Sequence, residues 1–161
     1  MKQLTQAELR TAGYLFYNAQ ISDANLVITE DGMLRPYLVL SGNGWSVRYG
    51  DKYAIGTIDK NTAEFKAYDK GLELLTKLMS LVETATFNGL IGKYIRVAVL
   101  PQVVEVSVIG HIVEDKWFDI QDFFVQDAET KVTANETTPV DEAPDKEPAA
   151  EADEAAEFNK P

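Results

Sequence analysis

The stretch that decides the fold is NLVITEDGMLRPYLVL, residues 25–40, which has the pattern of a β-hairpin. Residues 25–29 are rich in β-forming side chains, and residues 33–40 return to the same composition. The turn between them, Glu30-Asp31-Gly32, is of the Asp-Gly kind that favours a tight hairpin. Pro36 cannot donate a ladder hydrogen bond, so we expect that part of the second strand to lie at a sheet edge or a bulge.

A third strand is predicted directly after this hairpin. Residues 41–44, Ser-Gly-Asn-Gly, form a second turn. Trp45, Val47 and Tyr49 then alternate with Ser, Arg and Gly in a period of two, which indicates a strand with one apolar face. We expect this strand to continue through residues 51–55 after a bulge.

The segment before the hairpin begins with a helix signal. Thr5 and Glu8 have the spacing of a capping box at the start of a short helix. Gly13 weakens a longer helix, and residues 14–17 fit either its end or a first strand.

The clearest helix spans residues 69–84, with Asp69 as its predicted N-cap. Its apolar stripe is wide, which is typical of a helix packed on a sheet. The stripe consists of Leu72, Leu75, Met79 and Val82, widened by Leu74, Leu78 and Leu81.

After this helix the pattern returns to strands. We expect a strand at 93–100, a turn at Pro101-Gln102, a strand at 103–113 and a short helical turn near 117–124. The predicted fold class is therefore α+β, with antiparallel β-hairpins packed on one main helix in a single domain of residues 1–126.

The acidity of the chain is concentrated in residues 127–161. The whole chain has a net charge of −11, and this segment holds 11 acidic and 3 basic residues. It is rich in Pro, Ala and Glu, and it has too few large apolar side chains to offset the entropy of ordering. We expect a disordered acidic tail, which either keeps the protein soluble or serves as an interaction tail or a mimic of nucleic-acid charge.

Composition excludes several kinds of chemistry. The absence of cysteine excludes disulfides, cysteine nucleophiles and thiolate-bound metals, and the single histidine excludes a His-rich metal cluster within one chain. The negative charge argues against a general nucleic-acid binder. No apolar stretch approaches 18 residues and the N-terminus has no apolar signal region, so we expect an intracellular, soluble protein with no membrane partner, no metal and no cofactor.

The most unusual surface candidate is the glycine–aromatic hairpin, which combines glycines, aromatic rings and cations. Its predicted binding residues are Gly44, Trp45, Arg48, Tyr49 and Lys52. The rings can stack on a flat group, and the cations can meet a phosphate or carboxylate. The alternative is a hairpin whose aromatic side chains face the core.

The lone histidine, His111, has three acids nearby in the sequence. A catalytic interpretation pairs it with Glu114, Asp115 or Asp119, and the same acids could bind a hard cation. We favour a structural histidine bonded to local backbone, because no nucleophile motif accompanies it.

A modest basic face is the remaining candidate, formed by Lys93, Arg96 and Lys116. A strong nucleic-acid binder makes more phosphate contacts than these three can supply. Since no acid–base pair, nucleophile or metal set stands out, the chain is predicted not to be an enzyme.

Three stretches follow one another along the chain: the hairpin from Asp31-Gly32 to Lys52-Tyr53-Ala54, then Gly92-Lys93-Tyr94-Ile95-Arg96-Val97, and then the specific block IGHIVEDKWFD, residues 109–119. In this order they resemble a family of small uncharacterised proteins of tailed bacteriophages and prophages. The resemblance covers about residues 21–124. It implies origin in a phage genome and implies no reaction or ligand.

We therefore expect a non-enzymatic phage accessory protein of the host cytoplasm. It would bind a host protein or a small ligand through the glycine–aromatic hairpin, for example to counter a host defence. The alternative is a replication or recombination accessory protein that contacts single-stranded DNA, with stacking by Trp45 and Tyr49 and an acidic regulatory tail. A minor virion component is the third possibility.

Overall fold

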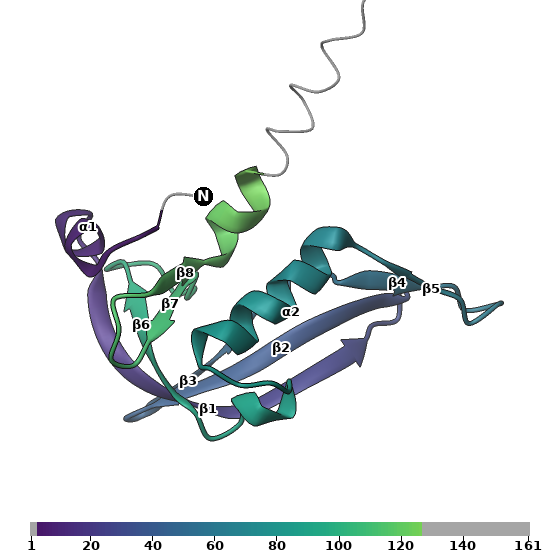
Figure 1. The fold of residues 1–161 in the computed structure, drawn as a ribbon, viewed down its shortest axis with the longest axis horizontal. Helices are drawn as coiled ribbons and strands as arrows, with labels where there is room; N and C mark the ends of the chain where they lie inside the picture. Colours follow the sequence, from purple (N-terminus) through teal and green to yellow (C-terminus); the bar gives the residue numbers. More distant parts are fainter. Residues whose placement is uncertain (1–2, 127–161) are drawn as a thin grey trace, which may run out of the picture.

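The computed structural model describes residues 3–126 and has an α+β fold. One curled antiparallel sheet of eight strands forms its centre, in the order β5-β4-β2-β1-β6-β7-β8, with β3 also paired to β2 (Figure 1). The elements are α1 (Gln6–Thr11), β1 (Leu15–Ile28), β2 (Met33–Gly42), β3 (Trp45–Tyr49), β4 (Gly56–Ile58), β5 (Phe65–Ala67), α2 (Asp69–Leu81), η1 (Asn88–Leu90), β6 (Tyr94–Val99), β7 (Val108–His111) and β8 (Trp117–Asp119). The predicted disordered tail lies outside the described residues.

The long strand β1 joins all the others into one sheet. Its first part, residues 15–20, pairs with β6, and residues 20–28 pair with β2. The register shifts between Ile21 and Asp23, so Ser22 occupies a bulge. Residues 14–17 thus lead into a strand and do not end a helix. The predicted antiparallel hairpins belong to one continuous sheet, because β1 is long enough to pair on both of its edges.

The hairpin of residues 25–40 is confirmed, including the position of its proline. Leu26 lies opposite Pro36 on β1, while the other edge of β2 pairs with β4 at residues 33–34 and with β3 at residues 38–42. Pro36 falls in the gap between these two partners, so its missing N–H interrupts no ladder.

Two predicted strands are shorter in the structure. Residues 51–55 form a turn and do not continue β3, because Gly50 takes a positive φ of 91° and redirects the chain. Residues 103–107 are irregular, and β7 begins only at Val108. The helical turn predicted near 117–124 is confirmed from residue 120, where a helical segment spans residues 120–126, and it is wrong for residues 117–119, which form β8.

Helix α2 begins and packs differently from the prediction. Tyr68 is its N-cap and Asp69 its first residue. The buried stripe is Gly71, Leu74, Leu78 and Leu81, rotated from the predicted one, and Leu72 is exposed. The helix ends at Leu81 because Glu83 adopts a left-handed φ of 55°, with bonds from Glu83 N–H to the Ser80 carbonyl and from Thr84 N–H to the Met79 carbonyl.

Apolar side chains gather in two clusters. The larger joins Leu74 and Leu78 of α2 with residues of β1, β2, β3, β6 and β7, and it includes Phe123 from the segment after β8. The smaller cluster contains Leu9 of α1 and Trp117 of β8. The predicted capping box of Thr5 and Glu8 at the start of α1 is confirmed. Among the residues described, no helix is long and apolar enough to cross a membrane.

Candidate binding surface

The two aromatic residues of the predicted glycine–aromatic surface belong to the core face of β3. Tyr49 is only 2% exposed, and its hydroxyl donates to the Ser107 carbonyl at 3.2 Å. Burial raises the pKa of the Tyr49 phenol well above its ordinary value. Trp45 is half-buried and packs against the larger cluster. The prediction that Tyr49 stacks on a ligand is therefore wrong, since strand alternation turns it inward with Trp45 and Val47.

The other three predicted residues lie outside the core. Arg48 points to the opposite face of β3, where its guanidinium carbon lies 5.1 Å from the centre of the Tyr37 ring. Gly44 lies in the exposed turn before β3. Lys52 donates to the Glu105 carboxylate at 2.5 Å, a bond that raises the pKa of the lysine. Arg48, Tyr49 and Lys52 line one shallow depression of about 260 Å³, but Trp45 does not.

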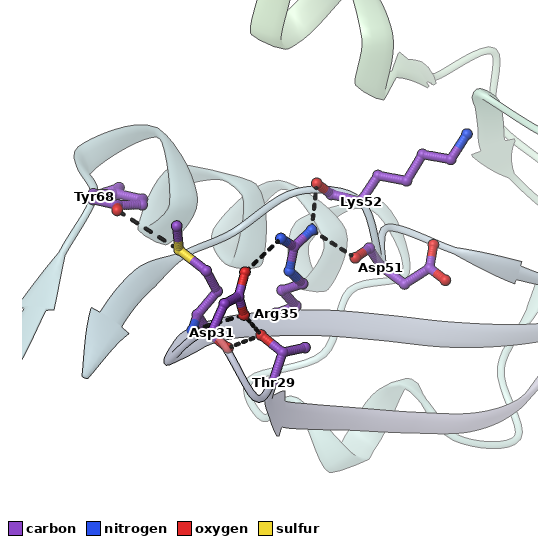
Figure 2. Close-up of polar contacts among 7 residues, drawn as sticks. Thr29, Asp31, Arg35, Asp51, Lys52 and Tyr68 are labelled. Carbon is purple, nitrogen blue, oxygen red and sulfur yellow. Dashed lines mark hydrogen bonds and ion pairs between the residues drawn. The ribbon is translucent and has the colours of Figure 1, made fainter. Parts of the chain in front are cut away.

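The turn that carries Lys52 is held in place by Arg35 of β2. The Arg35 Nη1 donates to the carbonyls of Lys52 at 3.0 Å and Asp51 at 3.4 Å, and its Nη2 lies 3.6 Å from Asp31 (Figure 2). Figure 2 also shows the Tyr68 hydroxyl directed at the sulfur of Met33. Arg35 thus ties the turn at residues 51–52 to β2 and pairs with the carboxylate of Asp31.

His111 has a structural role at the end of β7. Its Nδ1 accepts the backbone N–H groups of Val113 at 3.2 Å and Glu114 at 2.9 Å. Two backbone donors thus occupy Nδ1, so no carboxylate orients the ring from that side. None of the three acids weighed as its partners bonds to the ring in the described residues: Asp115 accepts from Gln6 N–H and from the Trp117 indole.

Arg96 ties the residues of the 109–119 block together. Its guanidinium donates to the carbonyls of His111 at 2.8 Å and Glu114 at 2.5 Å and to the Gln6 side chain at 2.9 Å. It also covers the Trp117 ring at 4.6 Å. Three of its five N–H donors are thus used within the fold, which fixes the guanidinium in a structural role. Of the predicted basic face, only Lys93 has no side-chain bond described within residues 3–126.

We expect Arg96→Lys to lower the free energy of unfolding by about 2 kcal/mol, because an ammonium cannot reach three separated acceptors and cover a ring. Urea unfolding followed by circular dichroism measures this change. Arg48→Lys is the matched control, since it loses only a ring contact at an exposed site. Equal losses in both variants would contradict the organising role of Arg96.

Asp119 also serves the local structure. Its carboxylate accepts the N–H groups of Gln121 at 2.9 Å and Asp122 at 3.3 Å, which caps the helical segment 120–126. Burial raises the pKa of this carboxyl, and the two backbone bonds oppose the rise. Within residues 3–126, no three His, Asp or Glu side chains converge to hold a metal ion.

The feature that sequence reasoning missed is an open edge on β1. On the side away from β2, β6 and the turn before it occupy this strand only as far as Ile21, which bonds to Lys93 and Gly92. Hydrogen-bonded pairs alternate in an antiparallel ladder. The Thr29 N–H donates to the Met33 carbonyl, so the peptide groups of every second residue before it, Val27 and Asn25, also face β2. The peptide groups of residues 24, 26 and 28 therefore point away from β2.

This open edge, residues 24–28, is apolar and has free backbone groups. Leu26, Val27 and Ile28 are 45%, 40% and 57% exposed. The Ala24 N–H is satisfied by the Asp23 carboxylate at 3.0 Å. Within residues 3–126, Leu26 and Ile28 pair only with β2, and no bond is described for their outward N–H and C=O groups. Figure 1 shows no strand beside this end of β1 except β2.

Sequence alone held a weak signal for this edge. Three consecutive large apolar residues, 26–28, break the alternation that a strand with one solvated face would show.

No protein-family model matches this chain, and neither a curated protein nor a solved structure matches it.

Proposed function

We propose that this chain is a non-enzymatic accessory protein of a tailed bacteriophage that binds a host protein in the host cytoplasm, and that it binds through the open edge of β1. The observation that carries the proposal is the set of outward peptide groups at Leu26 and Ile28, which have no bond described within residues 3–126, beside exposed apolar side chains. Such an edge accepts an extended segment of another protein as an added strand.

The local geometry favours an added strand over a small ligand. Strand addition uses peptide groups spaced along the backbone, and the open edge presents two successive donor–acceptor sets, at Leu26 and Ile28. The depression at Arg48 and Lys52 offers fewer free groups, because Lys52 is paired with Glu105. The single-stranded DNA alternative loses one of its two stacking rings with the burial of Tyr49.

The test removes one outward donor without touching the β2 ladder. Leu26→Pro deletes the N–H that faces away from β2, a position where a strand tolerates proline. Leu26→Thr is the matched control, because it keeps the N–H and the β preference while it removes the apolar side chain. The probe is a fluorescein-labelled peptide, Lys-Val-Thr-Val-Thr-Val-Lys, followed by fluorescence anisotropy.

We expect Leu26→Pro to weaken peptide binding roughly tenfold or more, and Leu26→Thr to weaken it less. Circular dichroism checks that each variant is folded, and Ile28→Pro gives the same test if Leu26→Pro is not. Failure of the wild-type chain to bind the peptide, or undiminished binding by a folded proline variant, would overturn the proposal.

A further inference from the structure

The charges at both ends of the open edge are negative. Asp23 lies at one end, where its carboxylate accepts the Ala24 N–H and the Asn25 amide at 2.7 Å. Glu30 lies exposed in the turn at the other end, and no ion pair is described for it within residues 3–126. No lysine or arginine occurs between residues 11 and 34. Of the cations close to the turn, Arg35 is paired with Asp31, and the Lys60 side chain lies near Gly32.

The same acids argue against a second copy of this chain as the occupant. In an antiparallel pairing of two β1 edges centred on Leu26, Asp23 of one copy falls opposite Thr29 of the other and next to its Glu30. Symmetry repeats this like-charge contact at the other end of the paired strands. Like charges facing each other across strands destabilise the pairing.

We propose that the occupant is an extended segment with a short apolar centre and a basic residue on each flank; this inference rests on the proposed function. The apolar centre covers Leu26 and Ile28 on one face and Val27 on the other, because side chains alternate across a strand. The basic flanks lie against Asp23 and Glu30, where opposite charges attract each other. A second copy would bring acidic residues to the same positions.

The experiment compares three labelled peptides that share the centre Val-Thr-Val-Thr-Val and differ only in lysine, serine or glutamate flanks. At low ionic strength we expect the lysine-flanked peptide to bind roughly tenfold more tightly than the glutamate-flanked one, with serine between them. Added salt should reduce the difference. Glu30→Lys should reduce or reverse the difference in affinity between the lysine-flanked and the glutamate-flanked peptide. Glu64→Lys, on the β4–β5 hairpin, should leave that difference unchanged.

The outcomes separate this inference from the proposed function. Equal binding of all three peptides, lost in Leu26→Pro, overturns the charge preference and leaves strand addition standing. Binding of none of them overturns both. A dimer in analytical ultracentrifugation that Leu26→Pro dissociates would identify the occupant as a second copy and would also overturn the basic-flank proposal.

Discussion

Replacing Gly71 with alanine is expected to lower the free energy of unfolding by about 3 kcal/mol, although the same change stabilises most helices. A Cβ at position 71 would lie 2.2 Å from the Cα of Ile55 and 2.8 Å from its carbonyl carbon and oxygen. These are backbone atoms, and Ile55 N–H is bonded to the Leu34 carbonyl while its own carbonyl accepts the Tyr68 N–H. The clash therefore cannot be relieved without moving α2 away from the backbone at Ile55.

Urea unfolding followed by circular dichroism measures this loss. Thr76→Ala on the exposed face of α2 is the control, because it changes helix propensity without any close approach. A stabilised or unchanged Gly71→Ala protein would mean that α2 does not press against the chain at Ile55.

Replacing Phe123 with alanine is the second large effect that we expect, with a loss of about 4 kcal/mol. The ring is fully buried at 0% exposure and contacts the Phe118 ring at 5.4 Å and the Phe124 ring at 5.1 Å. The Lys70 ammonium covers it at 4.1 Å. The variant leaves a cavity between α2 and β8, where packed backbone cannot fully collapse.

The control for Phe123→Ala is Val125→Ala, which lies on the same helical segment with an exposed side chain. We expect that control to change the urea midpoint very little. A small effect of Phe123→Ala would place the segment 120–126 outside the core and would argue against a domain that extends to residue 126, a boundary that stays a prediction.

Local signals in the sequence predict the structure correctly where neighbouring residues decide the conformation. The capping box of Thr5 and Glu8, the Asp31-Gly32 hairpin and the turn at Pro101-Gln102 depend on a few adjacent residues. The position of Pro36 also followed from its own chemistry, because a residue without an N–H must lie where no ladder bond is needed.

The candidate site was harder to predict because it depends on long-range pairing. The alternation of Trp45, Val47 and Tyr49 reveals that they share a face, but it does not say which face meets the core. The rotated stripe of α2 has a similar cause: Gly71 contributes nothing to hydrophobic periodicity, yet its lack of a Cβ lets α2 approach Ile55 and so turns Leu72 outward.

The amino-acid sequence by itself determined the α+β class, the antiparallel hairpin at residues 25–40 and the lack of cysteine chemistry, because composition, turn residues and short periodicities act locally. Only the tertiary structure decided that Tyr49 is buried, that His111 and Arg96 organise the β7–β8 hairpin, and that β1 has an open edge. An edge is open or closed according to which distant strand reaches it, and β6, whose residues lie 74 to 84 positions after their partners, pairs with β1 only at residues 15–20.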